Sequence, residues 1–417
     1  MGSEIDPDSK VYNISKGSTH KQVSAGEWTK DVLKGRDSAR SGDEIAVGHF
    51  TDPLIGRRPA TIPYDSLLRG LINIGESGVG KSTLTDNILI QMAEDGYGFC
   101  HIDMRGQVND LIQQLPDDRA DDIEIIGSYK NKDRKGFDIL ETPPDDEYID
   151  QASASFADFV GADLTGISKA IVGGIGKLAF ENDMNIEDVL GMLYEEDSND
   201  NVDVDESYYG PLMNSIRSLE AEDMEMEPVI RRIKRIAETP MLNRIITDED
   251  GLSLYNAISE GKIIIVSPES VADIDTKTEI AHAVLRKMIN VFKHTQSSRE
   301  NFFISVDEAD HLQISDHNLD WYFTRSRGYD VGVILTIQYL DQIEDRRMVL
   351  NNTENLVTFR HSEVETANRL TSLLDIEGRD EIMDLDRYTI FTRLNGKYGL
   401  FNRQISTFPQ LKCQIDS

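Results

Sequence analysis

A glycine-rich segment combines residue types that bind phosphate groups. It has the spacing G-x-x-x-x-G-K-[S/T] and consists of Gly75, Glu76, Ser77, Gly78, Val79, Gly80, Lys81, Ser82 and Thr83. Glycines allow the backbone to bend around a phosphate and to direct several N–H donors at it. In this pattern the lysine, here Lys81, reaches the β- and γ-phosphates, and the hydroxyl of Ser82 holds Mg²⁺. The segment therefore predicts a site for a nucleoside triphosphate and Mg²⁺.

The flanking residues provide the structural setting that such a loop needs. Residues 71–74 are an apolar run typical of a buried strand, and residues 85–92 have the apolar spacing of a helix. This order places the positive end of the helix at the phosphates. A glycine turn that binds no ligand is the alternative, and both flanks disfavour it. Kinases, GTPases, transporters and DNA motors share the loop, so other residues must separate these classes.

A second motif, which is acidic, is the expected partner of the phosphate loop. The apolar run Phe302–Val306 ends in Asp307 and Glu308. An aspartate at a strand tip holds the Mg²⁺ shell, and a glutamate beside it polarises the attacking water, which favours hydrolysis as the reaction. The alternative is a surface Asp-Glu pair that only ends a strand, which the five apolar and small residues before it disfavour.

Polar residues around the next predicted strand complete the candidate site. Gln338 ends the run 331–337, where an amide can hydrogen-bond the γ-phosphate or the water; a strand-end amide satisfied by a loop is the alternative. Arg325 and Arg327 precede the same run. One of them can reach a neighbouring subunit's nucleotide and stabilise the charge of the transferring phosphate. Arg360 is a third candidate for that role.

The composition is that of a folded but very acidic protein. The chain has 417 residues, 39% of them hydrophobic, and a net charge of −32 from 75 acidic and 43 basic residues. The acidic residues are spread along the chain, which favours adaptation to molar salt in an extreme halophile over an acidic protein that avoids nucleic acid. In molar salt the Debye length is about 3 Å, so the charge does not exclude DNA as a partner. The two cysteines form no disulfide or metal spacing, and Cys100 is expected in the core.

Patterns along the chain predict four regions. Residues 1–40 form a polar arm, residues 41–145 the first part of an α/β core, residues 146–240 an inserted helical domain, and residues 241–417 the second part of the core. Alternating strands and helices predict a parallel, doubly wound sheet. Asn395-Gly396 predicts a type I′ hairpin turn. We find no signal peptide and no apolar run long enough to span a membrane, and expect a cytoplasmic protein that is at most membrane-peripheral.

The predicted helical region holds the densest basic cluster, residues 231–235. Arginine and lysine at this density are typical either of a solvated helix face that pairs with nearby glutamates or of a surface that faces DNA. The first alternative is favoured, and the second stays open.

The order of the motifs resembles the HerA–FtsK superfamily of P-loop motors, and within it the coupling-protein ATPases of conjugation and type IV secretion. The likeness spans about residues 45–405 and rests on the phosphate loop, Asp103-Met104-Arg105-Gly106, Val306-Asp307-Glu308, and the stretch from Arg327 to Gln338. Two features depart from the family. Where the family usually has Asp-Pro-Lys-Gly, this chain has Arg105 in place of the lysine and lacks the proline. The N-terminal membrane helices typical of coupling proteins are not found in this sequence.

The resemblance implies a RecA-like core, a hexameric ring and ATP-driven movement of DNA through the ring pore. It carries Lys81, Ser82, Asp307, Glu308 and Gln338 over as site residues, with Arg327 as the basic residue before the glutamine strand. A secretion channel, a plasmid or virus DNA-transfer system, or a packaging machine are the partners it implies. Two other functions stay open: an ATPase motor for protein secretion or assembly that carries no nucleic acid, and a scaffold gated by nucleotide. Glu308 argues against the scaffold, because a switch needs no efficient base.

Overall fold

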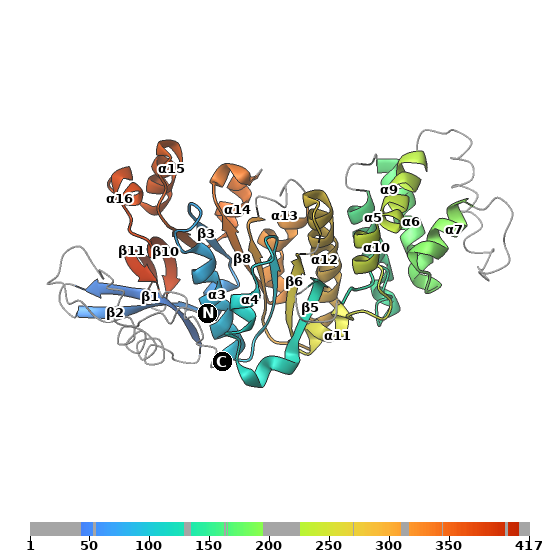
Figure 1. Ribbon diagram of the computed structural model, residues 1–417, viewed down its shortest axis with the longest axis horizontal. Coiled ribbons are helices and arrows are strands. Elements are labelled where there is room, and N and C mark those ends of the chain that lie inside the picture. Colours follow the sequence, from blue (N-terminus) through green and yellow to red (C-terminus); the bar gives the residue numbers. More distant parts are fainter. Residues whose placement is uncertain are drawn as a thin grey trace, which may run out of the picture.

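The computed structural model describes residues 43–52, 56–128, 135–161, 164, 166–194, 226–269, 271–309, 317–343, 345–396 and 399–407. The predicted polar arm 1–40 and most of the acidic stretch before residue 226 lie outside these ranges. The part of the chain that is described contains one large sheet, helices on both faces of it, and a group of helices at one end (Figure 1).

An 11-stranded sheet forms the centre of the molecule, in the order β2-β1-β11-β10-β9-β3-β8-β7-β4-β6-β5. The strands from β9 to β5 run parallel and those from β2 to β10 are antiparallel. Their bounds are β1 Glu44–Asp52, β2 Gly56–Pro63, β3 Leu71–Ile74, β4 Gly98–Asp103, β5 Ile123–Ser128, β6 Ile263–Pro268, β7 Phe302–Asp307, β8 Val331–Ile337, β9 Asn355–Thr358, β10 Thr389–Gly396 and β11 Gly399–Thr407. This sheet, parallel at its centre, confirms the predicted α/β class.

Helices cover both faces of this sheet. Those in or beside the core are α2 Tyr64–Leu67, α3 Lys81–Glu94, α4 Asn109–Ile112, α11 Leu254–Ser259, α12 Ile274–Thr295, α13 His317–Thr324, α14 Arg346–Asn352, α15 Val364–Leu374 and α16 Arg379–Met383. Short 3₁₀ helices are η1 Asp117–Asp122, η2 Asp146–Tyr148, η4 Ser326–Tyr329 and η5 Leu340–Gln342. The helix expected over residues 108–115 is shorter, because only residues 109–112 are helical before Pro116.

Because successive side chains of a strand point to opposite faces, the sheet has two hydrophobic cores, one on each face. In β6, Ile263 and Ile265 join the core that contains the apolar side chains of α3, whereas Ile264 and Val266 join the core that contains α12. Successive side chains of a strand point to opposite faces, so a strand buried on both sides is a continuous apolar run. The continuous apolar runs from which buried strands were predicted arise because these strands are covered on both faces of the sheet.

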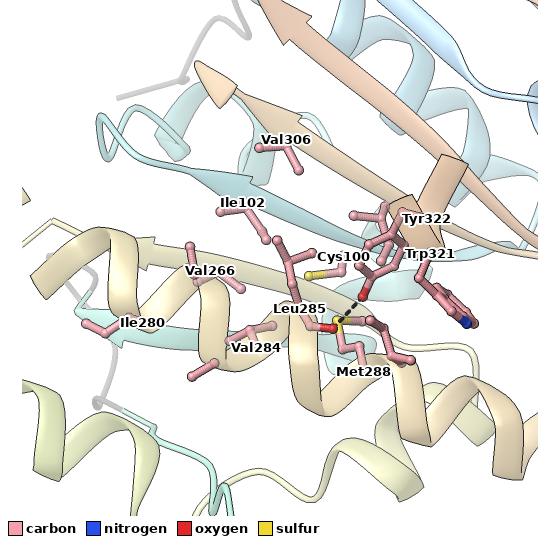
Figure 2. Close-up of a cluster of buried hydrophobic side chains, with 14 of the residues drawn as sticks. Cys100, Ile102, Val266, Ile280, Val284, Leu285, Met288, Val306, Trp321 and Tyr322 are labelled. Carbon is pink, nitrogen blue, oxygen red and sulfur yellow. Dashed lines mark hydrogen bonds between the residues drawn. The ribbon is translucent and has the colours of Figure 1, made fainter. Parts of the chain in front are cut away.

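Figure 2 shows the core between α12 and the sheet, where side chains of α12 pack against those of β4, β6 and β7. Cys100 lies in this cluster with no exposed surface, as predicted, and burial raises the pKa of its thiol. The hydroxyl of Tyr322 is also buried, and it donates to the main-chain carbonyl of Leu285 at 2.6 Å. The buried polar group is thereby satisfied, and α13 is attached to α12.

A group of helices extends from one end of the sheet (Figure 1). It comprises α5 Ile149–Val160, α6 Gly166–Glu181, α7 Ile186–Tyr194, α9 Met226–Glu238 and α10 Pro240–Ile246. The group meets the core at α12, where Arg286 pairs with Asp158 of α5 at 3.1 Å. Lys287 of α12, almost fully buried, donates to the carbonyl of Glu141 at 2.5 Å.

The C-terminal hairpin is present, but its turn is not where the sequence indicates. Asn395 and Gly396 are the last residues of β10, and Gly396 pairs with Gly399. Asn395 and Gly396 are therefore not the turn residues, and residues 397–398, which follow them, lie outside the described residues. Gly396, which together with Asn395 suggested the turn, instead belongs to the last pair of the ladder.

Candidate active site

The phosphate loop follows β3 and leads directly into α3. Gly80 precedes the first residue of α3 with φ of +121°, a conformation that side chains other than glycine rarely adopt. The loop is attached to the sheet on both sides, because the N–H of Gly75 donates to the carbonyl of Ile337 at 3.3 Å and the N–H of Tyr388 donates to that of Val79 at 3.0 Å. These contacts fix a curved backbone at the carboxyl edge of the parallel strands, where α/β proteins bind ligands.

Lys81 and Ser82 lie at the start of α3. The Lys81 ammonium, 7% exposed, donates to the main-chain carbonyl of Glu76 at 2.8 Å, so it lies against the loop itself. The Ser82 hydroxyl donates to Oδ2 of Asp307 at 2.8 Å. Asp307 is the last residue of β7 and is 8% exposed. Two motifs far apart in the sequence thus meet at one edge of the sheet.

The charge of Asp307 is held in a crowded acidic environment. Burial raises the pKa of this carboxyl and Asp103 raises it further, while His101, Ser82 and Lys81 oppose the shift. Asp103 is the register partner of Asp307 across β4 and β7. A hydroxyl and a carboxylate side by side are oxygen donors of the kind Mg²⁺ prefers, and excess negative charge favours a cation. Ser82 and Asp307 therefore fit the Mg²⁺ site expected from the sequence.

Glu308 and Gln338 lie beside that pair. Glu308 is 3% exposed and has φ of +52°, and its N–H donates to Oδ1 of Asp307 at 3.0 Å. The left-handed conformation of a glutamate is uncommon and recurs at functional sites. The half-buried amide of Gln338 donates from Nε2 to Oε1 of Glu308 at 3.4 Å. The expected base and the expected γ-phosphate ligand are in contact.

The two arginines expected to act on a neighbouring subunit's nucleotide lie away from the phosphate loop of their own chain. Arg325 and Arg327 precede β8, whereas the phosphate loop follows the carboxyl end of β3, which runs parallel to β8 in register Ile74–Ile337. The two exposed arginines are thus at the opposite edge of the sheet. Arg327 lines a cavity of about 390 Å³ there, together with Arg69, Glu354 and other residues. Neither arginine can reach the phosphate loop of its own chain.

Arg360 lies beside the loop rather than away from it. Its carbonyl accepts the N–H of Glu76 at 3.3 Å, and its guanidinium lies 4.0 Å from the Glu76 carboxylate. Burial acts to raise the pKa of Glu76, but hydrogen bonds from Ser362 lower it below its usual value. His361 is fully buried next to this pair, and burial lowers its pKa to about 4. Arg360 therefore contacts the phosphate loop of its own chain, through Glu76.

The sequence patterns assigned no role in the site to three residues that lie in it. Arg105 forms an ion pair with Oε1 of Glu308, and Asp103 accepts hydrogen bonds from the N–H groups of Arg105 and Gln107. Asp86 adds to the acidic cluster, since burial and the charges of Asp307, Asp103 and Asp110 raise its pKa well above the usual value. Asp86 had a usable signal, because it lies four residues after Ser82 on the same helix face.

The basic cluster 231–235 lies on α9, with Ile233 buried between its charged residues. Lys234 pairs with Glu238 at 3.4 Å, and Arg235 pairs with Glu279 of α12 at 2.9 Å. Part of the cluster is therefore the solvated, glutamate-paired face that the sequence favoured. Arg231 is exposed.

The phosphate loop, the acidic strand tip and the parallel sheet together define a P-loop NTPase with a RecA-like fold. Solved structures of two proteins share that fold. The bacterial conjugative coupling protein TrwB, without its first residues, has a TM-score of 0.62 at 14% identity, over 92% of this chain and 93% of that one. The same protein in complex with ADP and Mg²⁺ has a TM-score of 0.58 at 17% identity, over 92% of each chain.

VirB4 of Thermoanaerobacter pseudethanolicus is the second, with a TM-score of 0.60 at 15% identity, over 89% of this chain and 97% of that one. At these identities the likeness establishes the fold, including the helices beside the sheet. No protein-family model matches the sequence, and no curated protein matches it either. Among the described residues, no helix has the length and apolar character needed to cross a bilayer.

Proposed function

We propose that the chain hydrolyses ATP. The observation that carries this proposal is the convergence of Ser82, Asp307 and Glu308 at the carboxyl edge of the sheet, with 2.8 Å between the serine hydroxyl and the aspartate. A nucleotide switch needs the first two groups, but a buried carboxylate directly after the metal-binding aspartate is suited to activating water. The solved structures of TrwB with ADP and Mg²⁺ support the same assignment by fold.

The mechanism follows from the groups present. Loop N–H groups and Lys81 bind the β- and γ-phosphates, and Ser82 and Asp307 hold Mg²⁺, which when bound neutralises phosphate charge. Glu308 accepts a proton from the attacking water while the water oxygen bonds to the γ-phosphorus. The bond from that phosphorus to the bridging oxygen breaks, and ADP leaves with the electron pair. Gln338 orients the water or the γ-phosphate through its amide.

We further propose that hydrolysis drives DNA through the pore of a homo-hexamer, as a motor of conjugation, type IV secretion or plasmid and virus DNA transfer. The placement of Arg327 supports a ring, because an arginine at the opposite edge of the sheet can complete only a neighbour's site. The fold shared with the coupling protein TrwB supports a transfer role. In this proposal the inserted helices of 146–240 form a domain beside the core, and the motor works in a halophile's cytoplasm.

ATPase activity in molar KCl, with and without DNA, tests the proposal. Wild-type protein is expected to hydrolyse ATP faster with DNA. Lys81→Ala is expected to lose nucleotide binding, and Glu308→Gln to retain binding and lose hydrolysis by about 100-fold or more. Glu377→Gln, an exposed glutamate, is the matched control and keeps wild-type activity. No hydrolysis by a folded wild-type protein that binds ATP would refute the ATPase assignment.

A motor for protein secretion or assembly is the second candidate. It is favoured by the pairing of Lys234 and Arg235 with glutamates, which leaves less positive charge on α9 for phosphates. The same assay separates the two functions. Hydrolysis that DNA does not stimulate at any salt concentration favours the protein motor.

A further inference from the structure

Arg105 places a cation on the proposed base. Its guanidinium forms an ion pair with Oε1 of Glu308, and the two side chains differ in exposure, 35% for Arg105 and 4% for Glu308. Of this pair, only the arginine reaches solvent. It can change partners without unfolding the site, whereas the glutamate cannot leave it.

The loop that carries Arg105 is built to hold the backbone in place. Asp103, at the tip of β4, accepts the N–H of Arg105 at 2.8 Å and also that of Gln107. Gly106 has φ of +74°, and a Cβ there would lie 2.8 Å from the side chain of Glu269. Met104 is 3% exposed and anchors the loop in the core. The guanidinium is therefore presented from a fixed backbone, and its side chain is the part that can move.

Glu308 is held just as firmly. Its N–H is bonded to Asp307 and its φ is +52°, while Gln338 donates to the same Oε1 that Arg105 contacts. One oxygen of the base thus receives two donors, one of them charged. A charge-assisted hydrogen bond of this kind occupies the carboxylate oxygen to which the attacking water would otherwise donate. In this arrangement Glu308 is restrained as a base.

Resting on the proposed ATPase function, we propose that Arg105 is a positioning residue that withholds Glu308 from the attacking water. A guanidinium binds phosphate as readily as carboxylate, in the same bidentate geometry. The γ-phosphate of a bound nucleotide competes with Glu308 for Arg105, and hydrolysis occurs only in the fraction of nucleotide-bound sites in which the arginine has exchanged from Glu308 to phosphate. The arginine thereby links occupation of the site to activation of water and slows hydrolysis in the nucleotide-bound site.

The test compares the steady-state kinetics of Arg105→Ala, Arg105→Lys and the wild type, each as the full chain without DNA. Arg105→Ala is expected to raise kcat about tenfold, the effect of one charge-assisted hydrogen bond, with KM changed less than about threefold. Arg105→Lys restores the restraint in part. Arg379→Ala removes a more exposed arginine that pairs with Asp380 on the surface, and is expected to leave kcat unchanged.

A double variant identifies the group through which Arg105 acts. Arg105→Ala in the Glu308→Gln background is expected to hydrolyse ATP no faster than Glu308→Gln alone. A rise in that background, or a fall or no change of kcat in folded Arg105→Ala, overturns the proposal. If the wild type hydrolyses ATP and Arg105→Ala is not faster, the proposed restraint of Glu308 is refuted but the ATPase function is not. If neither protein hydrolyses ATP, the ATPase function is refuted as well. If Arg105→Ala hydrolyses ATP and the wild type does not, both the restraint and the ATPase function are supported.

Discussion

Ser82 donates a hydrogen bond to Asp307 at 2.8 Å, although 225 positions separate them in the chain. The contact exists because β3, β8 and β7 are parallel neighbours, so the loop after β3 and the tip of β7 emerge at one edge of the sheet. No short sequence motif contains both residues. The sheet order alone converts two separate motifs into one site.

The first prediction concerns this pair. Asp307→Asn keeps the size of the side chain and removes its charge, so it should weaken Mg²⁺-dependent nucleotide binding about 10- to 100-fold. Binding of a fluorescent ATP analogue, with Mg²⁺ and with EDTA, measures the effect. Asp380→Asn, 85% exposed at its side chain, is the control. An unchanged difference between Mg²⁺ and EDTA in Asp307→Asn would refute the metal role.

The parts of the fold that the sequence predicted are those dictated by short-range patterns. The buried strands were visible because each is apolar on both faces, as in Ile263–Pro268. The roles of Lys81 and Asp307 follow from motifs whose chemistry is local. Strand order is not local: the C-terminal hairpin was predicted, but neither the 11-stranded extent of the sheet nor the pairing of that hairpin with β1 and β9 was.

The contacts that sequence missed depend on how loops converge. Arg105 lies within the block Asp103-Met104-Arg105-Gly106, to which the sequence assigned no role in the site, and its ion pair with Glu308 requires β4 and β7 to be neighbours in register. The hairpin turn was misplaced for a related reason. Asn-Gly favours a turn, but cross-strand pairing fixed the register so that Gly396 stayed in the ladder.

The second prediction concerns the phosphate loop's shape. Gly80 has φ of +121°, and a Cβ there would lie 2.7 Å from the ring of Tyr388. Gly80→Ala should therefore weaken ATP binding by about 2–4 kcal/mol, from backbone strain and the clash together. Gly78→Ala is the matched variant, because Gly78 also has positive φ but no atom within 4 Å. Calorimetric titration with ATP should show the larger loss for Gly80→Ala; equal losses would exclude the clash.

The third prediction concerns pH and the junction between the sheet and the helical group. Burial raises the pKa of Asp138 from 3.8 to about 6; a hydrogen bond from Leu140 and the charge of Lys287 oppose the shift, while Glu141 and Glu249 add to it. Between those pH values the folded chain holds a proton that the unfolded chain has lost. The contribution of Asp138 to stability therefore falls as pH rises through that window, by at most about 3 kcal/mol.

Asp138→Asn removes that titration and keeps an oxygen that can accept the N–H of Leu140, which lies 2.9 Å from Oδ1. The variant should be more stable than wild type at pH 7.5, and its advantage should shrink toward pH 4. Urea unfolding at constant high salt measures the difference at each pH. Asp380→Asn should show no pH-dependent difference from wild type. A difference for Asp138→Asn that does not vary with pH would refute the assignment.

The last prediction concerns Arg327 and the proposed ring. Because this arginine lies at the opposite edge of the sheet from its own phosphate loop, Arg327→Ala and Lys81→Ala should each abolish ATPase activity. An interface between an Arg327→Ala site and a Lys81→Ala neighbour has both an intact loop and an intact arginine. An equal mixture of the two variants should thus recover about one quarter of wild-type activity, the fraction of such interfaces in a randomly mixed ring. Mixing Arg325→Ala with Lys81→Ala in the same way identifies which arginine acts. No recovery from either mixture of assembled variants would show that these arginines do not serve a neighbour's site.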